Sequence, residues 1–269
     1  MSMRDALYEA PGPRLKRIIR IGTVIALVLV AVVIAAIVHR FWLKGQLAPR
    51  YWSFFAQPST WAFLGSGLLG TFAVALSAGL IAIVLGLVLM LGRTSTFSPL
   101  ALVCRVVTEF FRGVPSLLLI YFFFMVLPQL GVKLDAFWMI CPPIALTASG
   151  VLAEVFRSGV NAVPKGQVEA ALSLGMRPLR VKFVIVLPQA IRYVIPSLIS
   201  QLVVVVKDTT LAYVVSYPDF LQNARVLISR YDAQVSTYLV VAVVYVIINY
   251  LINQVAVTVS RKTGARVAE

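Results

Sequence analysis

The sequence predicts an all-α membrane protein with about six transmembrane helices. Of its 269 residues, 60% are hydrophobic and only 13% are charged, and the mean hydropathy is +0.93. Soluble domains are typically about half apolar and a quarter charged. The apolar residues also gather in blocks long enough to span a bilayer, separated by short polar segments rich in Lys and Arg. Helices are expected in these blocks, because a spanning helix satisfies its own backbone hydrogen bonds.

The first apolar block is interpreted as a retained anchor helix. Residues 1–17 form a basic arm with a Pro-Gly-Pro break at residues 11–13, and Ile21–Val38 then carries no charge. A secretory signal has a shorter apolar core and a small-residue cleavage site. We therefore expect a cytoplasmic arm over residues 1–17 and an anchor helix over residues 18–42.

Five further blocks follow, and together they are assigned to one transmembrane domain over residues 60–260. Their approximate bounds are Trp61–Leu91, Leu100–Leu127, Ala136–Val160, Ile195–Val215 and Val235–Val259. Glycines in the first of these five blocks favour close helix packing in lipid. A basic tail over residues 261–269 ends the chain.

The distribution of basic residues predicts that both termini are cytoplasmic. Six spans place the two termini on one side, and of the 24 Lys and Arg residues, 14 fall on that side, six on the other and four within spans. Cytoplasmic loops carry the excess of Lys and Arg. The net charge of +14 is thus explained by loop charge and does not indicate a nucleic-acid partner.

Several classes of function lack their sequence signals. The chain has no G-x-x-x-x-G-K-[ST] motif for ATP, no G-x-S-x-G and no H-E-x-x-H. With one histidine and two cysteines, no metal site is expected. The chain is therefore not expected to be an enzyme or to hold a cofactor, and energy for any work must come from a gradient or another subunit.

A basic segment interrupts the apolar blocks at residues 161–190, and two cytoplasmic helices are expected there. Pro164 can start the first helix, Gly175 can end it in the left-handed conformation, and Pro188 should bend or break the second. The first helix would present a small-residue surface at Ala170 and Ala171, which suits close approach by a protein partner. The alternative is an amphipathic helix resting on lipid headgroups.

Besides Arg105, six charged residues lie inside the apolar blocks, where charge is costly and usually faces a bundle interior or a water path. They are Glu109, Arg112, Glu154, Arg157, Lys207 and Asp208. The first four form two E-x-x-R pairs, each on one helix face, which could meet at similar depth on antiparallel helices.

Two interpretations of these charges stay open. They could hold the helices together as self-paired ions, with Lys207 and Asp208 neutralising each other. They could instead line a pathway in which Arg112 and Arg157 bind a carboxylate and Glu154 or Asp208 takes an ammonium group.

The basic segment also resembles a known family. Glu169-Ala170-Ala171, three residues, Gly175, nine residues, Ile185, one residue and Leu187-Pro188 match the EAA loop of ABC importer permeases. The segments TEFFRGVPSLLL, AEVFRSGVNAVPKGQVEAA and VVKDTTLAYVVSYPDFL are similar to the polar amino acid subfamily, and LYEAPGPR in the arm is similar to glutamate-uptake permeases. The resemblance covers about three quarters of the chain, from Thr60 to Arg261.

The resemblance implies the transmembrane domain of a type I ABC importer with one extra N-terminal helix. The coupling loop would contact an ATP-binding subunit through Glu169, Ala170, Ala171, Gly175, Leu187 and Pro188. Two copies of that subunit would bind the ATP, beside a second identical or homologous permease and an extracytoplasmic binding protein, in a bacterial plasma membrane. The expected cargo is a polar amino acid, glutamate first, with glutamine, aspartate or a basic amino acid as alternatives.

A secondary transporter driven by an ion gradient is the competing function. Such folds commonly show internal repeats, and here only the E-x-x-R pattern repeats. A purely structural scaffold would leave the in-span charges without a transport role.

Overall fold

A computed structural model describes residues 12–263 of the chain, with side chains up to residue 259. These residues form two units, which divide between Ala56 and Gln57. Parts of the predicted arm (residues 1–11) and tail (residues 264–269) lie outside the described residues.

The first unit is one long helix followed by two short 3-10 turns. α2 runs over Pro13–Leu43, with proline at its first position, and η1 (Pro49–Tyr51) and η2 (Ser53–Ala56) follow. No residue of α2 is buried in the structure, and its residues 21–38 are apolar on all sides, as expected for a lipid-facing anchor. The helix starts five residues before the predicted anchor, because proline is well suited to a first helical turn.

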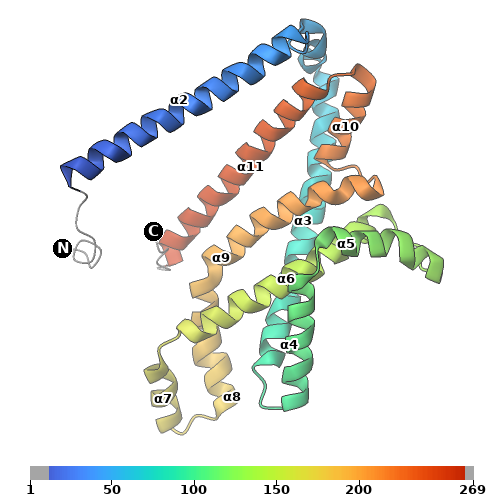
Figure 1. Cartoon of the computed structure of the whole chain (residues 1–269). Helices are drawn as coiled ribbons and strands as arrows, with labels where there is room; N and C mark the ends of the chain where they lie inside the picture. Colours follow the sequence, from blue (N-terminus) through green and yellow to red (C-terminus); the bar gives the residue numbers. More distant parts are fainter. Residues whose placement is uncertain (1–11, 264–269) are drawn as a thin grey trace. The chain divides into compact units, whose positions relative to one another are not determined.

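Within its described residues, the regular structure of the second unit is all helical, with short turns between the helices (Figure 1). Its long helices are α3 (Pro58–Arg93), α6 (Ala136–Ala162), α9 (Leu187–Asp208) and α11 (Gln234–Thr263). The shorter elements are α4 (Ser98–Gly113), α5 (Ser116–Tyr121), η3 (Phe122–Val126), η4 (Leu127–Leu130), α7 (Lys165–Ser173), α8 (Pro178–Val181), η5 (Lys182–Val186), η6 (Thr209–Val215) and α10 (Phe220–Tyr231).

The predicted fold class is confirmed. Within residues 12–263, five helical segments are long and apolar enough to cross a membrane, and a sixth is counted if a bent pair forms one span. That bent pair is α4 with α5 to η4, whose axes differ by 96°. The expected span over residues 100–127 is therefore bent in the structure. Val114 precedes a proline and takes an extended conformation (φ −80°, ψ 127°), which ends α4.

Small residues let α6 approach three neighbouring helices closely. A Cβ at Gly86 of α3 would lie 2.8 Å from Leu152, and one at Gly150 would lie 2.8 Å from the backbone nitrogen of Arg112 on α4. A Cβ at Gly159 would lie 2.7 Å from the carbonyl oxygen of Ala190 on α9. Without an internal hydrophobic driving force in lipid, such close packing is what holds helices together.

The chain stays helical through Pro188, so the break expected there is absent. α8, η5 and α9 run on without a gap, and the five residues before α9 form a π-helical turn. Pro188 is the second residue of α9. The wider π-helical turn accommodates the missing proline N–H and the bulk of its ring, as π-bulges commonly do.

An additional helix, α10, packs against α3 at the end of the unit opposite to α7 and α8 (Figure 1). The Asp219 carboxylate caps it by accepting a hydrogen bond of 2.8 Å from the backbone N–H of Gln222. Asn223 Nδ2 donates to the carbonyl oxygen of Phe63 at 2.7 Å. Gly70 of α3 leaves space for the connection before α10, since a Cβ at Gly70 would lie 2.4 Å from the carbonyl oxygen of Pro218.

Candidate functional site

Five charged side chains from three helices form one cluster. Arg93 at the end of α3 contacts Glu154 of α6 through its Nη1 atom and lies 3.6 Å from Glu109 Oε1 of α4. Arg157 Nη2 lies 2.8 Å from Glu154 Oε2, and Arg112 Nη1 lies 3.6 Å from Glu154 Oε1. The two E-x-x-R pairs therefore meet across α4 and α6, as their spacing predicts.

Glu154 is the centre of this cluster. Its side chain is 19% exposed and contacts three arginines, whereas Glu109 is 47% exposed. Arg93 was not among the predicted site residues, because its position next to a polar turn indicated only loop charge. With three arginines and two glutamates the cluster keeps one net positive charge, which favours an anion on its exposed side.

A small pocket of about 200 Å³ brings Arg112 and Asp208 together between α4, α5, α6 and α9. Asp208 Oδ2 accepts a hydrogen bond of 3.1 Å from the Ser116 hydroxyl at the start of α5. Thr147 and Gln201 also line this pocket. They are uncharged residues inside apolar blocks, and sequence reasoning based on charge did not find them.

The pocket thus places a cation and an anion on the same walls, which suits a ligand that carries a carboxylate and an ammonium group. Lys207 is exposed instead, and within residues 12–263 it makes no ion pair with Asp208. The suggested neutralisation of Lys207 by Asp208 is therefore not observed.

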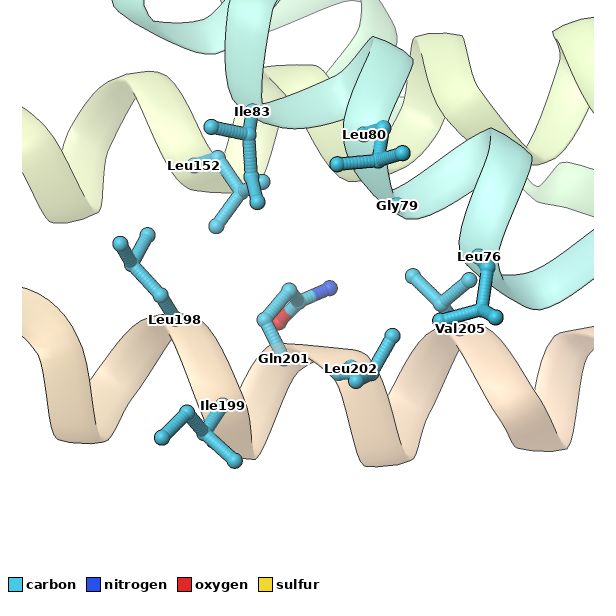
Figure 2. A pocket seen from close by; sticks show the side chains of 10 residues that line it. All are labelled: Leu76, Gly79, Leu80, Ile83, Leu152, Leu198, Ile199, Gln201, Leu202 and Val205. Atoms are coloured by element: carbon cyan, nitrogen blue, oxygen red, sulfur yellow. The ribbon is translucent and has the colours of Figure 1, made fainter. Parts of the chain in front are cut away.

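A second pocket, of about 170 Å³, lies between α3 and α9, with Leu152 of α6 on its wall (Figure 2). Its lining is aliphatic except for Gln201, whose amide points into the space. Burying a charged ligand without partners is costly, so this pocket does not suit a zwitterion. Gln201 borders both pockets.

The segment at residues 161–190 contains α7, as expected, but its second helix is not separate: α8 continues through η5 into α9 as one membrane-length segment over Pro178–Val215. α7 starts after Pro164, and Gly175 ends it with φ +78°. The N–H of Met176 donates to the Ala171 carbonyl at 3.2 Å, and that of Gly175 donates to the Leu172 carbonyl at 2.9 Å. These two bonds are those of a Schellman cap.

The exposed surface of α7 differs from the expectation at one residue. Glu169 and Ala170 are exposed, but Ala171 is buried against Val181 and Val186. Ala171 therefore lets α7 pack closely on α8 and η5, and it does not belong to a free surface. Leu187 packs against the helical core and Pro188 is exposed on α9, so neither lies on α7.

Residues 80–264 match the model of a protein family described as the binding-protein-dependent transport system inner membrane component. The chain belongs to this family. Membership confirms the class indicated by the EAA loop: a multi-pass membrane permease rather than an enzyme. It implies a binding protein that delivers the cargo and a separate ATP-hydrolysing subunit.

Individual relatives agree with the family. The permease is 32% identical over 226 residues to the glutamate transport system permease protein GluD of Corynebacterium glutamicum, covering 82% of this chain and 83% of the relative. It is 34% identical over 199 residues to the probable glutamine ABC transporter permease protein GlnP of Bacillus subtilis, covering 72% and 91%.

Solved structures show the same architecture. The crystal structure of an amino acid ABC transporter with histidines superposes with a TM-score of 0.73 at 27% identity, over 78% of this chain and 98% of that chain. The MetNI methionine ABC transporter in an inward-facing conformation superposes with a TM-score of 0.64 at 18% identity, over 77% and 99%, which concerns the fold alone.

Proposed function

We propose that this permease forms the translocation pathway of an ATP-driven importer for a polar amino acid, with glutamate as the cargo. The observation that carries the proposal is the shared pocket of Arg112 and Asp208. Arg112 offers two-point hydrogen bonding to an α-carboxylate, and Asp208 accepts from the α-ammonium group.

The charge cluster supports an acidic cargo. Arg112 belongs both to the pocket and to the cluster around Glu154, whose net charge is positive. That positive charge attracts a side-chain carboxylate and opposes a guanidinium. Named relatives support the same choice, since GluD and the Escherichia coli glutamate/aspartate import permease protein GltK are among them. Other relatives are named for glutamine, arginine and cystine, so cargo must be measured.

The segment at residues 161–190, called the coupling segment, is the proposed site at which the energy of ATP hydrolysis reaches the permease. Glu169 and Ala170 present an exposed surface on α7, and Gly175 sets the angle at which α7 leaves α8. Two ATPase subunits would bind the ATP and dock on α7 of this permease and of a second permease, identical or homologous. Their closure would move the two α7 helices together and switch the pathway between its two openings, with both chain termini cytoplasmic.

Reconstitution tests the proposal. The permease is placed in liposomes with its ATPase and its binding protein, and uptake of radiolabelled glutamate, glutamine and arginine is compared. We expect ATP-dependent uptake of glutamate that unlabelled aspartate reduces and arginine does not. Uptake that needs an ion gradient and continues without ATP would contradict the importer, whereas ATP-dependent uptake of arginine alone would contradict only the choice of cargo.

A further inference from the structure

A groove at the coupling end of the permease has both an apolar wall and a cationic rim. It has a volume of about 850 Å³ and lies where α3 turns into α4 and where α8 begins. These elements lie at the same end of the second unit as α7 (Figure 1). The groove is separate from the pocket of Arg112 and Asp208, with which it shares no lining residue.

The side chains of the apolar wall are exposed on the surface of the protein and do not face its core. Leu179 is 71% exposed, Phe183 is 50% exposed, and Val88 and Leu100 are also exposed. Phe183, Leu179 and Val88 belong to helical segments that are apolar enough to cross a membrane. In a membrane, exposed apolar side chains on such segments are suited to contact with acyl chains.

The rim of the groove is polar and positively charged. Arg177 and Lys182 line it beside the turn residues Thr94, Ser95 and Thr96. Lys182 Nζ donates to Thr94 Oγ1 at 2.7 Å, which holds its ammonium group at the turn. Within the described chain neither cation has a carboxylate partner, and no described carboxylate lines the groove.

We propose that this groove binds an anionic phospholipid of the cytoplasmic leaflet. The phosphate would be held by Arg177 and Lys182, with hydroxyl donors from Ser95 and Thr96, and one acyl chain would lie along Leu100 and Phe183. Basic pockets beside transmembrane helices on the cytoplasmic side suit such headgroups. A soluble anion would use only the rim and leave the apolar wall uncovered.

The lipid would bridge two parts that a hydrogen bond between Lys182 and Thr94 also joins. One part is the turn after α3, and the other is the helix that begins with α8, directly after α7 along the chain. Binding of the lipid would therefore make the position of the coupling segment depend on the lipid composition of the membrane.

Native mass spectrometry of the full-length permease in neutral detergent tests this site. The probes are phosphatidylglycerol and phosphatidylcholine with identical acyl chains. We expect one phosphatidylglycerol to be retained and the double variant Arg177→Gln/Lys182→Gln to lose roughly ten-fold or more in affinity. Arg180→Gln is the matched control, because Arg180 is an exposed arginine of α8 that does not line the groove. Equal binding of the two lipids, or equal losses in the double variant and the control, would overturn the proposal.

A second variant and a competition separate the alternatives. Leu100→Trp fills the apolar wall and keeps both cations, so it should also weaken phosphatidylglycerol binding, and thermal unfolding of each variant shows that it is folded. Glycerol phosphate should not displace the lipid; displacement at equal concentration would indicate a small-anion site. Loss of the lipid when the ATPase subunit is added would assign the groove to the protein interface instead. Either result would overturn the lipid site.

Discussion

The Ser116 hydroxyl donates a hydrogen bond of 3.1 Å to Asp208 Oδ2, joining the start of α5 to the end of α9. The bond connects residues 92 positions apart. It leaves the other carboxylate oxygen of Asp208 available on a pocket wall that Arg112 also lines. The proposed binding of an amino acid depends on this pair of walls.

Asp208→Asn should lower ATP-dependent uptake by about 10- to 100-fold, because a charge-assisted hydrogen bond contributes about 1.5–3 kcal/mol. The asparagine oxygen can still accept from Ser116, so the fold should persist. Uptake into proteoliposomes measures the effect, and Ser116→Ala should cost less because it keeps the charge. Normal uptake in a well-assembled Asp208→Asn variant would remove Asp208 from the pathway.

Glu154→Gln should destabilise the permease by about 1–3 kcal/mol, since it leaves three arginines around a neutral side chain. The charge is 19% exposed, so the cost is lower than for a fully buried pair. Glu109→Gln is the matched control, and its effect should stay within about 1 kcal/mol because Glu109 is 47% exposed. Thermal unfolding in detergent compares the two; equal losses would show that Glu154 is not the centre of the cluster.

Gly175→Val should uncouple ATP hydrolysis from transport. Gly175 has φ +78°, and a β-branched side chain there would strain the turn by about 1–2 kcal/mol. Glu169→Lys should act similarly by reversing an exposed charge on α7. Gly166→Ala is the control, because a Cβ there meets nothing within 4 Å. The measurement is cargo-stimulated ATPase activity beside uptake, and unchanged stimulation in both variants would refute the coupling role.

Gly70→Ala should destabilise the contact between α3 and α10. The added Cβ would lie 2.4 Å from the Pro218 carbonyl oxygen, and overpacking of this kind costs about 1–3 kcal/mol. Gly65→Ala lies on the same helix in open space and should be neutral or slightly stabilising. Proteolysis within residues 216–231 and thermal unfolding report the effect, and identical behaviour of the two variants would contradict the close approach.

Asp219 should make stability depend on pH. Burial raises the pKa of its carboxyl from 3.8 to about 6, so the folded state binds the proton more tightly than the unfolded state. Stability should therefore fall as the pH rises from about 4 to about 6 and stay at its lower level above that range. Asp219→Asn keeps an acceptor for the helix cap and should abolish this dependence. Unfolding temperatures on both sides of the range measure it; an equal slope in the variant would assign it to another group.

The sequence predicts features that are set by a few neighbouring residues better than features that depend on the direction of the chain. The cap at Gly175 and most apolar blocks of span length are local signals, and the structure has them where the sequence predicts them, although the span expected from Ile195 begins at Pro178. Pro188 was expected to bend or break a helix, and the helix is not broken there, because a π-helical turn precedes the proline. The bend at Val114 was missed because the apolar run continues across it, and hydropathy does not register a change of direction.

By itself, the sequence determined the membrane class, the approximate spans and the coupling segment, because composition and backbone preferences act over short distances along the chain. The EAA loop also identified the family. Only the tertiary structure decided that Arg93 joins the cluster around Glu154, that Ala171 is buried, and that Asp208 and Arg112 share a pocket. The first and third relationships depend on how closely α6 approaches α3, α4 and α9, and that approach depends on the fit of glycines against distant atoms. The burial of Ala171 depends on the packing of α7 against α8 and η5.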